Sequence, residues 1–274
     1  MAGCDTLRVA LRPDGVAQVT MARPEVFNAF DEAMIAELDA AFAALEDNAQ
    51  VRIVVLAGEG RHFSAGAHLQ WMRRAAAASR EANLEDARRF AAMLARIEAC
   101  SRPTIARVQG AALGGGVGLV CACDTAVAAA DASFAVSEAR FGILPSVIAP
   151  YLVNAVGKRQ AQRLALSAER IGAAEACTVG LVHRVVPAGE LDRALEAVID
   201  QLRTGGPVAQ REIKQIFGRL AVGTITPEVR ELTAQTIARV RGSDEAREGF
   251  AAFLDKRDAA WTSGTSKTSK TSEP

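Results

Sequence analysis

A glycine run near the middle of the chain lies where a strand pattern gives way to a helix pattern. Gly110–Gly118 (GAALGGGVG) separates the β-branched run Thr104–Val108 from the apolar segment Leu119–Cys123. Three consecutive glycines at such a junction present backbone N–H groups and a helix N-terminus to an anion. The spacing is neither G-x-G-x-x-G nor a Walker sequence, so nucleotide binding is not indicated. Close packing of a helix is the alternative explanation of the same glycines.

A second segment of small residues, His62–Leu69 (HFSAGAHL), follows the strand-like run Ile53–Ala57 and a Gly-Glu-Gly turn at 58–60. Small side chains let the backbone approach a ligand closely. An exposed N–H near Ala67 could therefore donate a hydrogen bond to an oxygen that gains negative charge. A simple tight turn after a strand would explain the same sequence.

One carboxylate lies in an apolar setting. Glu138 belongs to the segment Phe134–Pro145, and its apolar neighbours are Val136, Phe141, Ile143 and Leu144. Burial among such side chains would raise the pKa of Glu138 towards neutrality, which suits a group that accepts and donates a proton. The alternative is a surface ion pair between Glu138 and Arg140.

The sequence around these segments alternates between two patterns. Apolar residues at spacings of three or four predict helices over Ala29–Leu45 and Leu84–Cys100. Short β-branched runs predict strands at Leu7–Leu11, Val16–Met21, Ile53–Ala57, Thr104–Val108, Thr125–Ala128 and Leu181–Val186. This alternation favours an α/β fold with mostly parallel strands.

Strand signals vanish from about Glu190 onward. Helices are predicted over Glu190–Arg203, Pro207–Leu220, Pro227–Arg241 and Asp244–Ala260. Their apolar stripes would suit a contact with another subunit; they comprise Leu232, Ile237, Val240, Phe250, Phe253 and Leu254. The final TSGTSKTSKTSEP contains no apolar residue and is predicted to be a flexible tail.

The composition of the 274 residues narrows the function classes. Lys+Arg and Asp+Glu both number 32, so no basic excess indicates nucleic acid. No run of about 18 apolar residues indicates a membrane span, and we expect a cytoplasmic protein. The histidines lack metal-ligand spacing, and the cysteines are best explained as free thiols, so neither a metal nor a cofactor is expected. These residues are His62, His68 and His183, and Cys4, Cys100, Cys121, Cys123 and Cys177.

Taken in order, five segments resemble the crotonase (enoyl-CoA hydratase/isomerase) family, from about Leu7 to Arg257. The five are Ala22–Phe30 (ARPEVFNAF), FSAGAHL, GAALGGGVGL with Cys123-Asp124, Glu138–Pro145 and Glu248–Arg257. The resemblance implies a spiral of β-β-α turns over residues 1–200 and a C-terminal helical trimerisation region over 201–261. Residues 262–274 would form a disordered tail. The expected assembly is a homotrimer, or a hexamer built from two trimers, that acts on acyl-CoA thioesters.

The same resemblance implies roles for particular residues. The N–H groups of Ala67 and Gly115 would form an oxyanion hole for the thioester carbonyl, with Glu138 as the acid/base. Trp71 and Met72 would line the acyl pocket, although ordinary helix packing explains both equally well. The implied substrate-binding residues are Val26, Ala65, Ala67, His68, Leu69, Trp71, Gly114, Gly115, Phe141 and Lys256, the last of them for the CoA phosphates.

One departure from the family pattern concerns a residue that would hold the water added to the substrate. Typical hydratases of this family carry a first glutamate just after the glycine run, where this chain has Gly118. The expected reaction is hydration of a 2-enoyl-CoA with Glu138 as the sole carboxylate. A Δ3,Δ2-enoyl-CoA isomerase that uses Glu138 as its single base, or a non-catalytic CoA-binding protein on the same scaffold, are the alternatives.

A narrower resemblance concerns the acyl group. The run at 67–72 (AHLQWM), Gly118 and Ser146–Pro150 (SVIAP) look like bacterial hydratases of methylglutaconyl-CoA, in leucine breakdown, or of isohexenylglutaconyl-CoA. Both substrates are branched and bear a distal carboxylate. A cationic group is therefore expected in the pocket, and the candidates are His68, His62 and Arg140.

Overall fold

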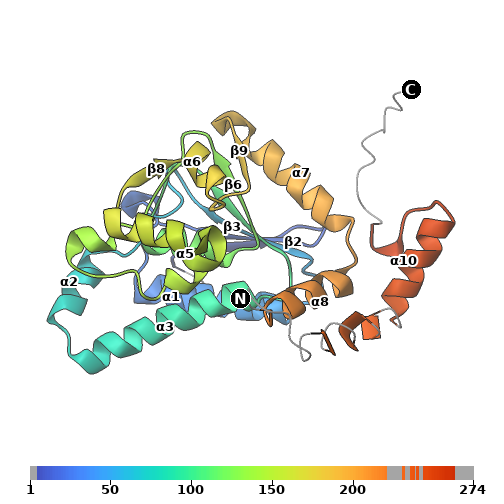
Figure 1. Ribbon diagram of the computed structural model, residues 1–274, viewed down its shortest axis with the longest axis horizontal. Helices are drawn as coiled ribbons and strands as arrows, with labels where there is room; N and C mark the ends of the chain where they lie inside the picture. Colours follow the sequence, from blue (N-terminus) through green and yellow to red (C-terminus); the bar gives the residue numbers. More distant parts are fainter. Residues whose placement is uncertain (1–4, 221–229, 232–234, 238, 241–242, 263–274) are drawn as a thin grey trace. The chain divides into compact units, whose positions relative to one another are not determined.

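A six-stranded sheet runs through the first two hundred residues (Figure 1). The computed structural model describes residues 5–220, 230–231, 235–237, 239–240 and 243–262. Only the first two strands of the sheet pair antiparallel, and every later pair is parallel. In sheet order the strands are β1 (Leu7–Leu11), β2 (Val16–Met21), β3 (Ile53–Gly58), β4 (Thr104–Val108), β6 (Thr125–Ala129) and β9 (Arg184–Val186). The predicted α/β fold with mostly parallel pairing is confirmed.

A second sheet consists of three very short strands. They are β5 (Ala111–Leu113), β7 (Ser133–Ala135) and β8 (Arg170–Gly172); β5 pairs parallel with β7, and β7 antiparallel with β8. Strands β4 and β6 of the large sheet are each followed directly by a strand of the small one, and helix α4 (Gly115–Ala122) joins the two pairs. The chain therefore passes through both sheets in successive turns. Three residues are too few to show an alternating pattern, so these strands could not be predicted.

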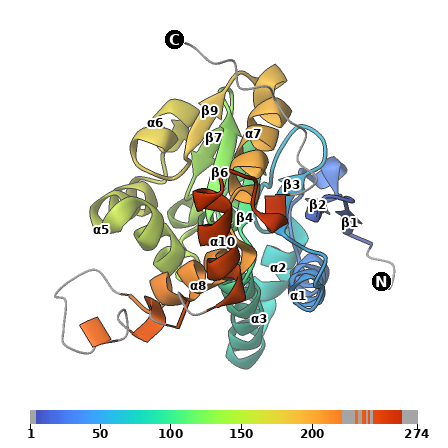
Figure 2. The ribbon, with the colours of Figure 1, turned by 90° about the vertical axis from the view of Figure 1, so that its right-hand side faces the viewer.

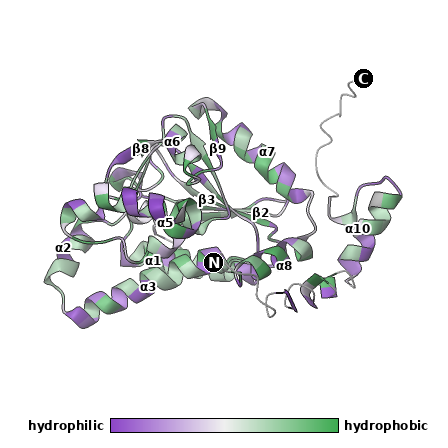
Figure 3. Ribbon diagram, in the orientation of Figure 1, coloured by the Kyte–Doolittle hydropathy of each residue, from purple (hydrophilic) through white to green (hydrophobic). Residues whose placement is uncertain are grey.

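Helices cover both faces of the large sheet. Figure 2 shows α5 (Ala149–Ser167) and α6 (Ala173–Thr178) on one side of the strands and α1 (Glu32–Glu46) on the other. Helix α3 (Arg80–Ala99) packs beside α1, and α2 (Leu69–Ala77) precedes it (Figure 1). Figure 3 shows hydrophilic and hydrophobic residues alternating along α3 and α5, as expected for helices with one buried face.

Two of the predicted helix starts were wrong by a few residues because side-chain caps set them. The Asp31 carboxylate accepts a hydrogen bond from the Met34 N–H, so α1 begins at Glu32 and not at Ala29. The Ser79 hydroxyl accepts one from the Ala82 N–H, so α3 begins before Leu84. Residues 29–31 are left free to join the loop that holds Ala67.

The predicted strand Leu181–Val186 is also too long. The N–H groups of Leu181 and Val182 both donate to the Ala176 carbonyl, at 2.8 and 3.3 Å, and so close the turn after α6. Only Arg184–Val186 pairs in the sheet, as β9. The remaining three-residue elements are 3-10 helices at Pro24–Val26, Ala188–Glu190 and Ala260–Thr262.

The chain divides into two units, Met1–Glu196 and Ala197–Pro274. Helix α7 (Leu191–Arg203) spans the boundary, and the second unit contains α8 (Pro207–Phe217) and α10 (Asp244–Leu254). Both helices end earlier than predicted. The Glu245 carboxylate accepts the N–H groups of Val208 and Ala209, at 2.8 and 2.7 Å, which fastens the start of α8 to α10.

Some predictions concern residues that the structure does not describe. Most of the predicted helix Pro227–Arg241, including Leu232, lies outside the described residues, as do Cys4 and residues 263–274. Among the helices that are described, none combines the length and the apolar character that a membrane crossing requires.

Candidate active site

The Ala67 N–H points away from the segment around Phe30, with which Ala67 pairs. The Phe30 N–H donates to the Gly66 carbonyl and the His68 N–H donates to the Phe30 carbonyl, both at 2.9 Å, which makes a parallel bridge between Phe30 and Ala67. In such a bridge the middle residue directs its own N–H to the opposite side. Among the described residues, no acceptor takes this N–H. Gly66 permits the turn because its φ is +82°, a conformation that favours glycine.

The Gly115 N–H is open for a different reason. Gly115 is the first residue of α4, and the first N–H groups of a helix have no partner inside it. A Cβ on Gly66 would lie 3.5 Å from the Gly115 nitrogen and 2.5 Å from the Leu113 carbonyl oxygen, so the two turns touch. The neighbouring Gly114 N–H is held by the Ala135 carbonyl at 2.8 Å. The structure thus brings together the two amides that the sequence singled out.

The Glu138 carboxyl group lies beside this pair. Glu138 begins the 3-10 helix Glu138–Phe141, separated from the end of β7 by two residues, and a Cβ on Gly114 would lie 3.1 Å from Glu138 Oε1. Glu138 Oε2 is buried and has no hydrogen-bond partner in the part of the chain that is described. Burial raises the pKa of Glu138. The prediction of a desolvated carboxyl is confirmed, whereas Arg140 is exposed to solvent.

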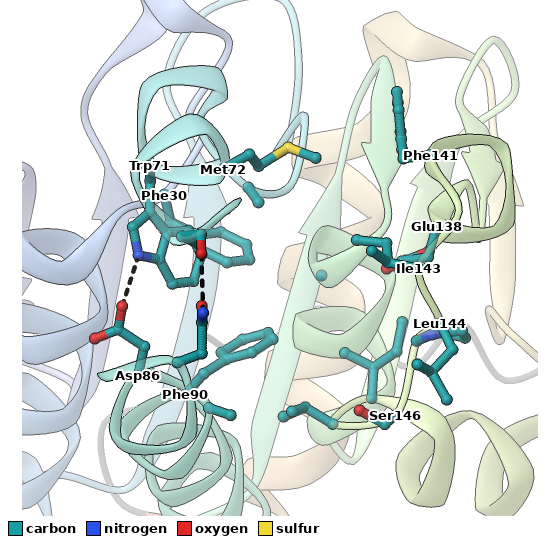
Figure 4. Close-up of a pocket in the computed structure, with 18 of the residues that line it drawn as sticks. Phe30, Trp71, Met72, Asp86, Phe90, Glu138, Phe141, Ile143, Leu144 and Ser146 are labelled. Carbon is teal, nitrogen blue, oxygen red and sulfur yellow. Dashed lines mark hydrogen bonds between the residues drawn. The ribbon is translucent and has the colours of Figure 1, made fainter. Parts of the chain in front are cut away.

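Two cavities of about 610 and 440 Å³ meet at these groups. Figure 4 shows the first, with Trp71 and Met72 facing Glu138, Phe141 and Ile143 across the opening. The second is lined by residues predicted to bind the substrate, among them Val26, Ala65, His68, Leu69 and Gly114. Both cavities share Ala67, Met72, Gly115, Glu138, Phe141 and Ile143. A long ligand could therefore place its two ends in different cavities and its middle at the amides.

Aromatic side chains form one wall of the first cavity (Figure 4). The Phe30 ring centroid lies 6.3 Å from that of Trp71 and 5.2 Å from that of Phe90. The Trp71 indole N–H donates to Asp86 at 3.3 Å, which joins α2 to α3. Trp71 also packs partly against the core, which confirms the helix-packing explanation, whereas its role in an acyl pocket stays a prediction. Phe90 could have been found from the apolar stripe of its helix, whereas no sequence signal marks Asp86.

Comparisons with known proteins identify the family of this chain. A family profile described as enoyl-CoA hydratase/isomerase matches residues 12–264. The chain belongs to this family. It is 30% identical to the short-chain-enoyl-CoA hydratase of Clostridium acetobutylicum, over 91% of this chain and 95% of that protein. It is 32% identical to the carnitinyl-CoA dehydratase of Escherichia coli, over 91% and 96%.

Solved structures extend the agreement to the fold. An enoyl-CoA hydratase from Shewanella pealeana superposes with a TM-score of 0.91 and 39% identity, over 94% of this chain and 96% of that one. The expected crotonase-like fold is confirmed, and the chain is an enzyme of the enoyl-CoA hydratase/isomerase family.

This family member has no room for a carboxylate at Gly118. A Cβ on Gly118 would lie 2.4 Å from Ile148 Cγ2 and 3.0 Å from Ile148 Cβ, so an isoleucine fills the space beside the glycine. A Cβ on Gly116 would similarly lie 2.7 Å from the Ser64 carbonyl oxygen. The packing explanation of the glycine run is therefore confirmed at these positions, whereas anion binding by the run stays a prediction. Gly116 and Gly118 serve packing, and Gly115 offers an open amide.

Replacing Gly118 with alanine is expected to lower the free energy of unfolding by about 1–3 kcal/mol, because the new methyl group overlaps Ile148. Adding Ile148→Ala should make room, so the double variant should lose less stability than the two single losses added together. Denaturant unfolding measures both effects. Gly189→Ala is the control, since a Cβ there would meet nothing within 4 Å. Strict additivity of Gly118→Ala and Ile148→Ala would contradict the packing account.

The three candidates for a cationic pocket group differ in whether they line a cavity. His68 lines the second cavity, and its Nδ1 accepts a hydrogen bond from the Gln70 N–H at the start of α2. His62 and Arg140 line neither of the two cavities. The His62 Nδ1 accepts from the Ala111 N–H at 3.0 Å, and burial together with nearby Arg61 lowers the pKa of His62. His62 is therefore a neutral structural group. Lys256 belongs to the second unit, and its role stays a prediction.

Proposed function

We propose that this enzyme is a hydratase that adds water across the 2,3 double bond of a branched 2-enoyl-CoA. The observation that carries the proposal is the meeting of two open amides and an unpartnered, desolvated carboxyl group where two cavities join. The acyl chain would occupy the first cavity and the pantetheine arm the second. The thioester carbonyl would then lie between the N–H groups of Ala67 and Gly115.

The reaction follows from where charge develops. Water adds to C3, and the thioester becomes an enolate whose oxygen carries the negative charge. Each amide donor directed at that oxygen can supply roughly 3–4 kcal/mol of transition-state stabilisation. Glu138 would accept a proton from the attacking water and then return a proton to C2. Its raised pKa suits both transfers, because a group poised nearer neutrality exchanges protons more readily in either direction.

A second candidate is Δ3,Δ2-enoyl-CoA isomerisation. The tight packing of Gly118 against Ile148 excludes a second carboxylate at that position, so Glu138 would act without it. Isomerisation needs one base that moves a proton between C2 and C4, and it uses the same enolate and the same amides. Hydration requires in addition that Glu138 alone orient the water.

The proposed acyl group is branched and uncharged. The first cavity is lined mostly by aromatic and aliphatic side chains, and no Lys, Arg or His from the described residues lines it. Its acidic members are Glu138 and Asp86, so no described lining residue offers a positive charge to a distal carboxylate. The carboxylated branched thioesters suggested by the narrower sequence resemblance are therefore the comparison substrates.

Product mass tests the proposal. The enzyme would be incubated separately with linear, branched and carboxylated 2-enoyl-CoA thioesters and with a 3-enoyl-CoA. A product one water heavier identifies hydration, whereas the appearance of a conjugated 2-enoyl thioester from the 3-enoyl substrate, seen by ultraviolet absorbance without a change in mass, identifies isomerisation. Unchanged substrates throughout would leave the non-catalytic CoA-binding alternative and end the proposal.

The pH dependence of kcat/KM should reflect the raised pKa of Glu138. Only the ionised carboxylate can take a proton from water, so the rate should fall as pH decreases through the raised pKa of this group. The acid limb should therefore lie above the ordinary carboxyl range of about 4.3. Initial rates of hydration between pH 4 and 9 measure it. A rate that instead falls as pH rises over this interval would assign Glu138 as the initial acid.

We also propose a cytoplasmic homotrimer or a hexamer of two trimers. Exposed apolar side chains in the second unit support a subunit contact, among them Ile213, Phe217, Phe250 and Leu254. Light scattering after gel filtration distinguishes one, three and six subunits. A monomer at micromolar concentration would contradict the proposed assembly.

A further inference from the structure

Asn28 is a fully buried polar residue whose side chain makes three hydrogen bonds to backbone. Its Oδ1 accepts from the Arg23 N–H at 3.0 Å, and its Nδ2 donates to the carbonyls of Glu59 and His62 at 2.9 and 2.8 Å. Asn28 also has a φ of +53°, which asparagine tolerates better than most residues. The side chain thus fastens the turn before α1 to the loop that follows β3.

The main-chain carbonyl of Asn28 extends this link to Ser64. The Ser64 hydroxyl donates to the Asn28 carbonyl at 2.9 Å and accepts from the Gly66 N–H at 3.2 Å. Ser64 is fully buried, so both bonds form away from water. Buried networks in which every member is bonded hold their parts in one arrangement. The residue before Ala67 is thereby tied to the turn that contains Asn28.

The backbone of Ser64 reaches the second amide. Its N–H donates to the Ala111 carbonyl at 3.1 Å, and its carbonyl accepts from the Leu113 N–H at 2.9 Å. These two bonds place Ser64 beside β5, which ends two residues before Gly115. Ser64 therefore contacts both segments that supply an open N–H. Neither Asn28 nor Ser64 lines either cavity, so neither side chain is placed to touch a substrate.

We propose that Asn28 and Ser64 are positioning residues that fix the spacing between the Ala67 and Gly115 amides. The inference rests on the proposed function, because the spacing matters only if both amides bind one oxygen. Donors to an oxyanion act at about 2.7–3.1 Å. A displacement of about 1 Å can lower the rate 10²-fold, even when its cause lies away from the reacting atoms.

Two variants test the positioning role kinetically. Asn28→Ser removes the amide, and Ser64→Ala removes the hydroxyl. Both should lower kcat, on the order of tenfold to a hundredfold, with a smaller change in KM. The control is Thr104→Val. The Thr104 side chain is similarly buried, and its hydroxyl donates a hydrogen bond to the Asp124 carboxylate and accepts one from the Asp124 N–H, both at 2.9 Å. Thr104 begins β4, away from the turn that follows β5. Thr104→Val should lose stability without losing kcat.

An infrared measurement separates positioning from general destabilisation. Butyryl-CoA labelled with ¹³C at the carbonyl is a saturated thioester that cannot be hydrated, and hydrogen bonds to its carbonyl lower the stretching frequency. Wild type and Thr104→Val should show the same downward shift on binding. Asn28→Ser and Ser64→Ala should show a smaller shift. If Ser64→Ala does not fold, Ser64→Cys keeps a weaker donor and should give an intermediate shift.

The possible outcomes separate the two proposals. Shifts in Asn28→Ser and in the Ser64 variant equal to that of wild type would overturn the positioning role and leave the proposed function intact. No shift in wild type, with binding shown by calorimetry, would overturn the oxyanion hole itself and with it the proposed function. A reduced shift in Thr104→Val as well would show that the spectrum reports only stability, and would also overturn the positioning role.

Discussion

Replacement of Glu138 with glutamine is expected to lower kcat about 10²–10⁴-fold, the contribution typical of general acid–base catalysis. Glutamine keeps the size of the side chain but can neither accept the proton of water nor return one to C2. The KM for the thioester should change little, because the amides are unaltered and glutamine keeps the shape of the cavity lining at this position. Steady-state rates with the best branched 2-enoyl-CoA and with a 3-enoyl-CoA measure the loss. Near wild-type turnover of both substrates would remove Glu138 from the mechanism.

The same variant should be more stable than the wild type at neutral pH. Burial raises the folded-state pKa of Glu138 above its unfolded value, so ionisation costs stability as pH rises through the unfolded and then the folded pKa. Glutamine cannot ionise and escapes this cost. The stability difference should vanish below about pH 4, where the carboxyl is protonated in both states. Thermal unfolding at pH 4 and pH 7.5 checks the sign, and a less stable variant at pH 7.5 would contradict the desolvated setting of Glu138.

Replacement of Ala67 with proline is expected to lower kcat about 10²–10³-fold. Proline has no N–H, so the substitution deletes one of the two donors that face the thioester oxygen. The deleted N–H makes no hydrogen bond to the described residues. The two hydrogen bonds of the bridge are donated by the N–H groups of Phe30 and His68, so they do not involve the Ala67 N–H. The loss should therefore appear in catalysis more than in folding. Rates, circular dichroism and the infrared shift of bound butyryl-CoA together measure it.

Ala67→Gly is the matched control for the proline variant. It removes the methyl group and keeps the N–H, so kcat and the carbonyl shift should stay close to wild type. If Ala67→Pro folds and keeps most of its turnover, the Ala67 N–H is not a donor to the enolate. If both substitutions lower kcat equally, the methyl group and not the N–H is what matters at this position.

Local patterns predicted the parts of the fold that depend on neighbouring residues. The β-branched runs gave β1, β2 and β4 with correct bounds, because β-branched side chains favour the extended backbone of a strand whether the strand is buried or partly exposed. Helix starts shifted where one capping side chain, such as Asp31 or Ser79, outweighed the apolar periodicity. The three-residue strands went unnoticed because pairing with distant partners, and not their own sequence, makes them strands.

For the candidate site, the sequence by itself determined the chemical groups. It supplied a glycine turn before a helix, a second turn of small residues and a carboxyl group surrounded by apolar residues, and their order along the chain indicated the family. Only the tertiary structure decided how these groups combine. The contacts of Asn28 with Ser64, of Gly118 with Ile148 and of Trp71 with Asp86 join residues from 15 to 36 positions apart. Packing and hydrogen bonds between such distant residues depend on how the whole chain folds, which no local spacing encodes.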